Sequence, residues 1–292
     1  MFGGFGMRGF QVYPVEGLPL ISCGDDLAGL TVEALEKLGL PLREGDIIVY
    51  SSKLVSKAEG RIVDIRGVEA SRRAKVLAAG LGRPAGFIQL VLDESVEVLG
   101  IWDGLLIVLD KRGMVCVNAG VDKSNVEGEY SYSLLPEDPY GSAEELLRRL
   151  REASGITRLG VVLADSATRP FRKGMIHYAL ACAGLRSLWD YRGSSDIYGR
   201  TLRFKVSSTA DMLACAAGLV MGEASEKVGA ALIRGLGNLT TEDEECEKLT
   251  VDGWQDIYHG VFQPHHRRRE APSDGSPKPI SPSPPKIPGE RG

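Results

Sequence analysis

Short apolar runs bounded by Gly, Pro or Asp alternate along the chain with segments whose apolar positions recur at helical spacing. The apolar runs predict strands at residues 11–15, 46–51, 105–109, 114–117, 160–164, 200–208 and 229–233. The other segments predict a helix that begins at Asp25 and ends near Gly39, and helices at 71–81, 142–153, 176–183 and 210–224. Because hairpin-like strand pairs lie beside helices, the predicted fold class is α+β (mixed α/β), not a regular doubly wound sheet.

Length and composition place the chain among globular proteins. Its 292 residues suffice for one large domain or two ordinary ones, and 43% hydrophobic with 25% charged residues is typical of soluble domains. No apolar run is long enough to cross a bilayer, and residues 1–8 lack the long apolar stretch of a secretion signal. These features predict a cytoplasmic protein with no membrane partner.

Residues 264–292 differ in composition from the rest of the chain, because they hold eight of the fifteen prolines and few large apolar side chains. This predicts a disordered tail rich in Pro, Ser and basic residues after a folded region at 1–263. The basic run at 265–269 either contacts an anionic partner or, as we favour, is solvated. The net charge is −4 overall and +3 in the tail, so the folded region carries −7, which argues against nucleic-acid binding.

The five cysteines are Cys23, Cys116, Cys182, Cys215 and Cys246, and none forms a Cys-x-x-Cys pair. Their odd number and wide spacing predict neither a disulfide framework nor a zinc site. Cys182 and Cys215 lie in Ala-rich segments that read as helical, where small buried thiols are common. We therefore expect free structural thiols rather than a catalytic cysteine.

One segment carries the clearest chemical signal. The apolar run at 160–164 is followed at once by Asp165, Ser166, Arg169 and Arg172. Ligands often bind at the C-terminal ends of strands in open sheets. A carboxylate can hold a metal, and arginines bind phosphate or carboxylate groups. The segment predicts an enzyme that handles an anionic substrate with the help of a metal.

Two loops carry weaker signals. The Gly- and Pro-containing stretch at 16–21 can offer backbone groups to a ligand, although we favour an ordinary structural turn there. The stretch at 51–60 follows a buried strand and carries Lys53 and Lys57 among several hydroxyl groups, which suits phosphate, although a solvated loop has the same composition. The sequence contains no P-loop and no Gly-x-Ser-x-Gly elbow, and no Gly-x-Gly-x-x-Gly follows a predicted strand, so those sites are not indicated.

Further oxygen donors follow other predicted elements. Asp122 and Asn125 come after the strand at 114–117, and Glu223 lies at the end of the helix at 210–224. Asp and Asn are also common in ordinary turns, and a Glu at a helix end is commonly solvated. If the fold gathers Asp122, Asp165 and Glu223, they form a hard-oxygen site suited to Mg²⁺ or Mn²⁺.

Taken together, these segments resemble the coenzyme F420-0:γ-glutamyl ligase family, from about Val12 to Gly235. The matching blocks follow in order: Gly17-Leu18-Pro19-Leu20 with Gly24-Asp25-Asp26-Leu27, Val55-Ser56-Lys57-Ala58-Glu59-Gly60-Arg61, Asn118-Ala119-Gly120-Val121-Asp122 with Ser124-Asn125-Val126, Asp165 with Arg169-Pro170 and Arg172, Asp196 with Gly199-Arg200, and Val220-Met221-Gly222-Glu223. The family usually has Asp-Thr-x-Gly-Arg-Pro, where this chain has Ser166 for Thr and Thr168 for Gly.

The resemblance implies a two-domain F420-ligase-like fold, with two intertwined subdomains inside residues 1–263 and an intertwined homodimer. It implies a GTP-dependent ligase that adds L-glutamate to coenzyme F420-0, and then a γ-linked glutamate to F420-1. The reaction would pass through an acyl phosphate and release GDP and phosphate. Mg²⁺ or Mn²⁺ is the implied cation, K⁺ is a further candidate, and GTP is the co-substrate.

The resemblance also implies roles for the matching positions. Contacts to the guanine nucleotide are implied for Leu18, Pro19, Leu20, Ile21, Ser52, Lys53, Lys57, Asn125, Met221, Gly222, Glu223, Ala224, Ser225, Glu226, Lys227 and Val228. Divalent metal would be held by Asp122, Asp165, Ser166 and Glu223. From their chemistry we assign Arg169 and Arg172 as catalytic residues that organise phosphate or a substrate carboxylate.

Three other functions stay open from the residues themselves. They are a nucleotide-dependent ligase that acts on another acid and amine, a non-catalytic GTP-binding protein, and a metal-dependent hydrolase. The first turns over nucleotide with other substrates, the second binds GTP without forming a product, and the third needs no nucleotide.

Overall fold

The computed structural model describes residues 9–243, 246–251, 256 and 258. The chain divides into a unit spanning Met1–Leu249, which contains every helix and strand named below, and a second unit spanning Thr250–Gly292. The predicted tail at 264–292 lies outside the described residues, as does its basic run.

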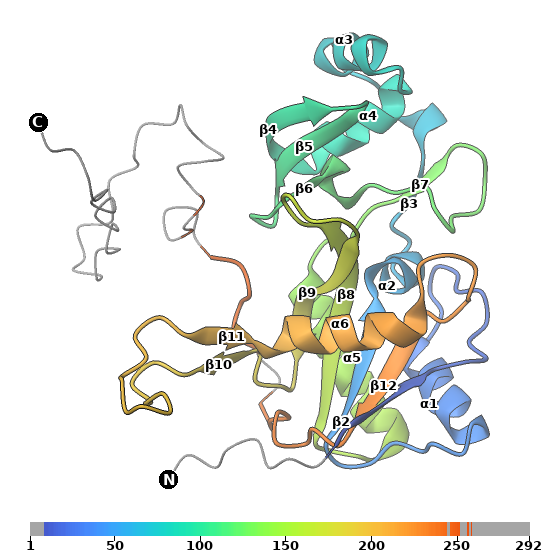
Figure 1. The fold of residues 1–292 in the computed structure, drawn as a ribbon. Helices are drawn as coiled ribbons and strands as arrows, with labels where there is room; N and C mark the ends of the chain where they lie inside the picture. Colours follow the sequence, from blue (N-terminus) through green and yellow to red (C-terminus); the bar gives the residue numbers. More distant parts are fainter. Residues whose placement is uncertain (1–8, 244–245, 252–255, 257, 259–292) are drawn as a thin grey trace, which may run out of the picture. The chain divides into compact units, whose positions relative to one another are not determined.

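A mixed five-stranded sheet lies at the centre of the first unit (Figure 1). Its strand order is β1 (Gln11–Pro14), β12 (Ala230–Arg234), β2 (Asp46–Ser51), β8 (Leu159–Thr168) and β9 (Met175–Ala183). The β2–β8 pair is parallel, and the other neighbouring pairs are antiparallel. Nearly all of β2 and the first part of β8 are buried, which explains why both read as continuous apolar runs.

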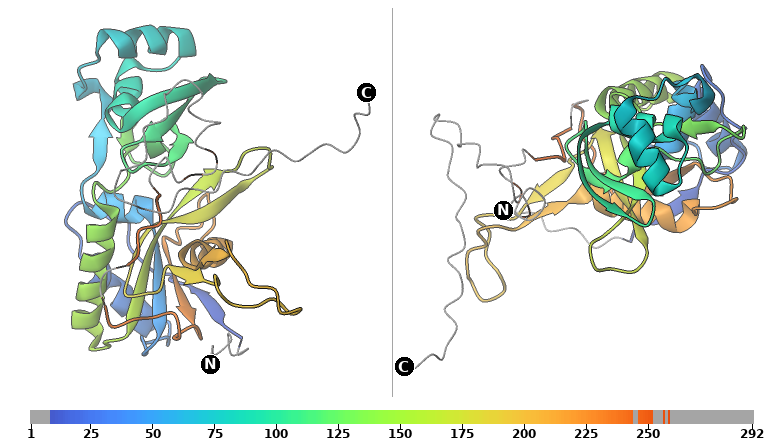
Figure 2. Two further views of the ribbon diagram at one scale, coloured as in Figure 1. Left: turned by 90° about the vertical axis from the view of Figure 1, so that its left-hand side faces the viewer. Right: turned by 90° about the horizontal axis from the view of Figure 1, so that it is seen from above.

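Helices cover both faces of this sheet, as Figure 2 shows. The helices α1 (Leu27–Lys37) and α5 (Pro139–Ser154) share one apolar core with the sheet, and α6 (Thr209–Met221) shares the other. Consecutive side chains of a strand point to opposite faces, so Ile48 enters the first core and Ile47 the second. The sheet is thereby the middle layer of three.

A third apolar core forms from the segment between β3 (Ile62–Asp64) and β7 (Ser131–Ser133). It contains the antiparallel strands β4 (Ser95–Trp102), β5 (Leu105–Asp110) and β6 (Val115–Val117), packed with α3 (Arg72–Leu81) and α4 (Ala85–Asp93). In the described part of the chain no single helix is long and apolar enough to cross a membrane. The pair α3 and α4 meets the length and composition requirement only together, with a bend of 119° between them.

Short elements connect these cores and frame the site. They are α2 (Ser52–Ala58), β3 (Ile62–Asp64), the 3₁₀ turns η1 (Ile65–Gly67) and η2 (Asn118–Gly120), β7 (Ser131–Ser133), β10 (Leu188–Asp190) and β11 (Val206–Ser208). β3 pairs with β7, and β10 with β11. The α+β class predicted from the sequence is confirmed, and the predicted strands at 11–15, 46–51, 105–109, 114–117 and 229–233 are present within about a residue.

Several local predictions were wrong. Residues 176–183 form strand β9 and not a helix. The sequence did not indicate a strand there, because burial between the two helical layers removes the alternation of polar and apolar residues that marks one. Of 200–208 only β11 is extended. The helix predicted from Ser142 begins at Pro139, and Asp138 caps it by accepting a hydrogen bond from the Gly141 amide (3.1 Å). α4 and β4 were not predicted, because Gly82 and Pro84 were taken as the end of helical structure.

The expectation of free thiols was also wrong for one pair. Cys182 of β9 and Cys246 are joined by a disulfide that spans 64 residues of sequence. Cys23, Cys116 and Cys215 are free. Sequence spacing could not reveal the pair, because 246 reaches β9 only after the chain has passed through β10, α6 and β12.

Candidate functional site

One cavity of about 470 Å³ gathers the predicted site residues. Every residue predicted to contact nucleotide and every predicted metal ligand lies in its wall. The wall is built from residues 18–21, the last residue of β2, helix α2, three residues of the segment 122–125, two residues of β8, one residue of β9 and the stretch 221–229. Segments from across the chain therefore meet at one place, although the role of each residue stays a prediction.

Helix α2 brings two lysines to the cavity. β2 ends at Ser51, whose hydroxyl caps α2 by accepting a hydrogen bond from the Leu54 amide (3.3 Å). Lys53 and Lys57 are four residues apart, so both project from one face of this helix. Burial lowers the pKa of Lys57, and the charge of Lys53 lowers it further. The stretch expected to be a loop is thus a helix that presents two cations to one cavity.

Asp165 lies inside β8, where its parallel neighbour β2 stops. Ala164 pairs with Ser51, the last residue of β2, whereas β8 continues to Thr168 beside β9. Burial raises the pKa of Asp165; hydrogen bonds from the Ser166 amide and the Ser52 hydroxyl act against this rise. The strand does not end at the carboxylate as predicted, but the carboxylate still lies where the neighbouring strand ends.

Asp122 faces the lysine helix from the opposite wall. Its carboxylate accepts a hydrogen bond from the Lys53 ammonium, and it also accepts from the amides of Lys123 (2.7 Å) and Ser124 (3.1 Å). Burial alone would raise the pKa of Asp122, but the hydrogen bonds from Lys53 and Ser124 bring it below its ordinary value. The negative charge of Asp122 in turn raises the pKa of Asp165, so these two carboxylates lie close enough to interact.

The stretch after α6 closes the cavity. The Asn125 side chain donates a hydrogen bond to the Ala224 carbonyl (2.9 Å), and the Glu226 carboxylate accepts one from the Ala224 amide (2.7 Å). The Glu223 carboxylate lies 2.8 Å from Nε2 of His177, a β9 residue. These contacts fix the turn at 222–227 against both β9 and the segment that carries Asp122.

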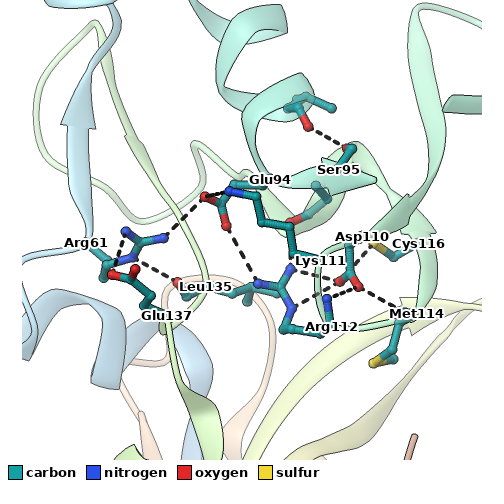
Figure 3. A network of polar contacts seen from close by, with 12 residues as sticks. Arg61, Glu94, Ser95, Asp110, Lys111, Arg112, Met114, Cys116, Leu135 and Glu137 are labelled. Carbon is teal, nitrogen blue, oxygen red and sulfur yellow. Dashed lines mark hydrogen bonds and ion pairs between the residues drawn. The ribbon is translucent and has the colours of Figure 1, made fainter. Parts of the chain in front are cut away.

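A network of charges holds the backbone that leads into this site (Figure 3). The Glu94 carboxylate contacts three cations, namely Arg61 (3.5 Å), Arg112 (3.8 Å) and Lys111 (3.9 Å). Arg61 lies just after α2, and its amide donates to the carbonyl of Ser56 (2.8 Å) in that helix. Glu94 therefore connects the end of the lysine helix to the β5–β6 turn.

Comparison with known proteins shows the family to which this chain belongs. The family model described as F420-0:Gamma-glutamyl ligase matches residues 17–235. The chain belongs to this family. Among its relatives, the protein of Archaeoglobus fulgidus named coenzyme F420:L-glutamate ligase is 46% identical over 226 residues, which is 77% of this chain and 88% of the relative. Proteins of the same name from Methanothermobacter thermautotrophicus (42% over 227 residues; 78% and 89%) and Methanopyrus kandleri (40% over 233 residues; 79% and 90%) are also similar.

The two arginines of the family's Arg-Pro-x-Arg segment lie apart from the cavity wall. Arg169 follows the end of β8, and its Nε atom is buried with no hydrogen-bond partner among the described residues. Arg172 is exposed, in the turn between β8 and β9. Thr168, where the family usually has Gly, is the exposed last residue of β8. The structure thus gathers the residues predicted to contact nucleotide and metal, but not the two arginines.

The cavity also contains residues to which no role was assigned from the sequence. They are Ser51, Leu54, Ser124, His177 and Gly229. Ser124 and Gly229 adjoin predicted residues, so proximity in sequence was a usable signal. His177 had none, because a single histidine in an apolar run carries no spacing pattern. It faces Glu223 only because the antiparallel pairing of β8 and β9 places it opposite Ser166.

The predicted metal residues fit a hard cation in part. Asp122, Asp165 and the hydroxyl of Ser166 are oxygen donors, the type that Mg²⁺ and Mn²⁺ prefer. Glu223 is paired with His177 instead, and within the described residues no three His, Cys, Asp or Glu side chains come together as a metal cluster. A divalent cation would thus bind at Asp122 and Asp165, where the Lys53 ammonium already contacts Asp122.

Proposed function

We propose that this protein is a GTP-dependent ligase that adds L-glutamate to coenzyme F420-0 and then a γ-linked glutamate to F420-1. Family membership and the names of relatives at 40–46% identity support the substrates. The observation that carries the proposal is the cavity whose wall contains two lysines and two carboxylates, with Lys53 paired with Asp122. Such a site suits a nucleotide triphosphate and the charge that develops during phosphoryl transfer.

The first chemical step would activate a carboxyl group. A carboxylate oxygen of F420-0 attacks the γ-phosphorus of GTP, the bond from that phosphorus to the β–γ bridging oxygen breaks, and GDP leaves. Lys53 and Lys57 neutralise phosphate oxygens from α2. Asn125 and the stretch at 221–228 hold the nucleotide against the opposite wall, and residues 18–21 cover it.

The second step would form the amide. The amino nitrogen of L-glutamate attacks the acyl carbon, the carbon–oxygen bond to phosphate breaks, and the nitrogen loses a proton. Arg169 and Arg172 are the candidates to bind the carboxylates of glutamate or F420-0, since guanidinium groups match carboxylate geometry. No step needs a protein nucleophile, so the enzyme's contribution is positioning and electrostatic stabilisation.

A divalent cation, Mg²⁺ or Mn²⁺, would be held by Asp122, Asp165, Ser166 and Glu223, and when bound it would neutralise phosphate charge. K⁺ is a further candidate that this proposal includes. In Glu223, Oε1 lies 2.8 Å from Nε2 of His177, so Glu223 would bind the cation through its other carboxylate oxygen.

The test is a product assay. The full-length protein is mixed with F420-0, GTP, Mn²⁺ and L-glutamate, and the products are read by mass spectrometry. We expect species heavier by one and two glutamyl units, together with GDP, and no such species without GTP. GTP turnover with another acid and none with F420-0 would overturn the substrate. No mass gain with any nucleotide would overturn the ligase activity.

We also propose that the enzyme is a homodimer. The segment between β10 and β11 exposes Ile197 (91%), Tyr198 (79%) and Phe204 (76%), and the β8–β9 turn exposes Phe171 fully. Large apolar side chains that are exposed on protruding loops commonly mark protein interfaces. Ile197→Asp should convert a dimer to a monomer in light scattering. The matched control is Val76→Asp, on an exposed position of α3 (66%), and it should leave the mass unchanged.

A further inference from the structure

Lys53 is held by three oxygen atoms that belong to one short segment. Its ammonium donates to the carboxylate of Asp122, to the carbonyl oxygen of Ser124 (2.7 Å) and to the hydroxyl of Ser124 (2.6 Å). The side chain is only 23% exposed, so these contacts lie within the cavity wall and not in bulk water. The three donor positions of an ammonium are therefore fully occupied.

These oxygens are also what a hard divalent cation would use. Carboxylate, carbonyl and hydroxyl oxygens are the preferred ligands of Mg²⁺ and Mn²⁺. Asp165 lies near enough for the charge of Lys53 to lower its pKa. The ammonium thus occupies the position of a cation on the segment of Asp122, in the same cavity as the partly buried carboxylate of Asp165.

We propose that Lys53 is a resident counter-ion that a divalent cation must displace from Asp122. The inference rests on the metal and nucleotide site proposed above. Once displaced, the ammonium loses its hydrogen bond to the Asp122 carboxylate, and a phosphate group that enters the cavity can replace that partner. Metal and nucleotide therefore bind cooperatively: the metal takes Asp122, and the nucleotide takes Lys53. Because coupling between two ligands is reciprocal, each raises the affinity for the other by the same factor.

The alternative is that any positive charge in the cavity weakens metal binding by repulsion alone. Lys57 separates the two explanations. It lies on the same helix and lines the same cavity, but no contact joins its ammonium to Asp122 among the described residues. Its replacement removes the same charge without releasing the carboxylate.

The experiment measures Mn²⁺ binding to the full-length protein without nucleotide, by electron paramagnetic resonance of the free ion. Lys53→Met should bind Mn²⁺ about tenfold or more tightly than the wild type. Lys57→Met should show a much smaller gain, and Lys53→Arg, which keeps a cation on Asp122, should stay close to the wild type. Thermal unfolding of each variant confirms that it is folded.

Two outcomes would overturn the inference in different ways. The displacement mechanism is wrong if Lys53→Met binds Mn²⁺ no more tightly than the wild type. It is also wrong if Lys57→Met gains as much Mn²⁺ affinity as Lys53→Met. Either result leaves the proposed metal site intact. The double variant Lys53→Met with Asp165→Asn tests the metal site itself. If it binds Mn²⁺ as tightly as Lys53→Met alone, the ion binds elsewhere. That result removes the metal site itself.

Discussion

The guanidinium of Arg112 donates a hydrogen bond to the carbonyl oxygen of Ala119, at a distance of 3.1 Å. Ala119 has a φ of 54°, a left-handed conformation that costs a non-glycine residue roughly 1–2 kcal/mol. Asn118 (φ 52°) and Gly120 (φ 73°) share this conformation, and the turn leads directly to Asp122. Arg112 therefore contacts the strained turn that precedes Asp122, the residue that accepts a hydrogen bond from Lys53.

Replacing Arg112 should destabilise the protein and disturb this turn. Its side chain is 13% exposed and contacts Asp110 (2.8 Å), whose side chain is 2% exposed. Arg112→Met leaves that buried carboxylate without its cation, which typically costs about 3–5 kcal/mol of unfolding free energy. Urea unfolding measures the loss, and ligase activity should fall in the fraction that stays folded.

The chain supplies a matched control. Asp64 and Arg66 repeat the spacing of Asp110 and Arg112 and make the same two-pronged contact, but on the exposed surface. Arg66→Met should therefore barely change the urea midpoint, because surface ion pairs contribute little. An equal loss for both variants would show that the burial of Arg112 is not what matters.

His177 should act on the reaction through Glu223. Its Nε2 atom lies 2.8 Å from the Glu223 carboxylate, and its ring is packed against Gly218, where an added Cβ would come within 2.7 Å of it. His177→Ala should lower activity about 10–100-fold, the usual effect of losing a partner that orients a metal ligand. His177→Gln, which keeps a polar group there, should recover part of the loss.

A structural role alone would give another result for His177. The Mn²⁺ concentration required for half-maximal activity should rise in His177→Ala, while the thermal midpoint changes little. An unchanged Mn²⁺ requirement with a lower thermal midpoint would reduce His177 to a packing residue.

The sequence predicted those parts of the fold in which local pattern and tertiary environment agree. The helix at 72–81 begins at a serine cap and ends at Gly82, and the structure contains both features. The helix predicted at 176–183 was wrong because the apolar pattern there reflects burial on two faces of a strand. Only the packing of α5 and α6 against β9 creates that burial. Cys182 was misjudged for the same reason, since its partner reaches it through the tertiary fold.

The site was predictable to the extent that chemistry follows from residue type. Asp122, Asp165 and the two lysines were found because carboxylates and cations next to strands are unusual enough to notice. The pairing of Lys53 with Asp122 was not predictable, since it depends on the turn at 118–120 that Arg112 and Glu94 hold. His177 was invisible for the corresponding reason, because only strand register brings it to Glu223.

Asp165→Asn should inactivate the enzyme and yet stabilise the ligand-free protein. Activity should fall by about a hundredfold or more, because a charge that organises the reacting groups is lost. Burial raises the pKa of the Asp165 carboxyl in the folded state, so its ionised form opposes folding above that pKa. Asparagine removes this opposition.

The sign of the pH dependence makes the Asp165 prediction specific. As pH falls through the raised pKa, the folded wild type takes up a proton before the unfolded chain does, and its disadvantage relative to Asp165→Asn shrinks. Urea midpoints should thus differ most at about pH 7 and converge near pH 4, the ordinary range of a carboxyl group. A difference that stays constant with pH would mean that ionisation is not its cause.

Removing the disulfide should lower stability through the freedom it gives the unfolded chain. Cys182 and Cys246 close a loop of 64 residues that contains β10, β11, α6 and β12, and a loop of that size is typically worth about 2–4 kcal/mol. Cys246→Ser should unfold at lower urea than the wild type, and reductant should lower the wild type to the same midpoint without affecting the variant. Cys23→Ser, at an exposed free thiol, should keep the wild-type response to reductant. Alkylation of five thiols in the unfolded, unreduced protein would contradict the bond, whereas three are expected.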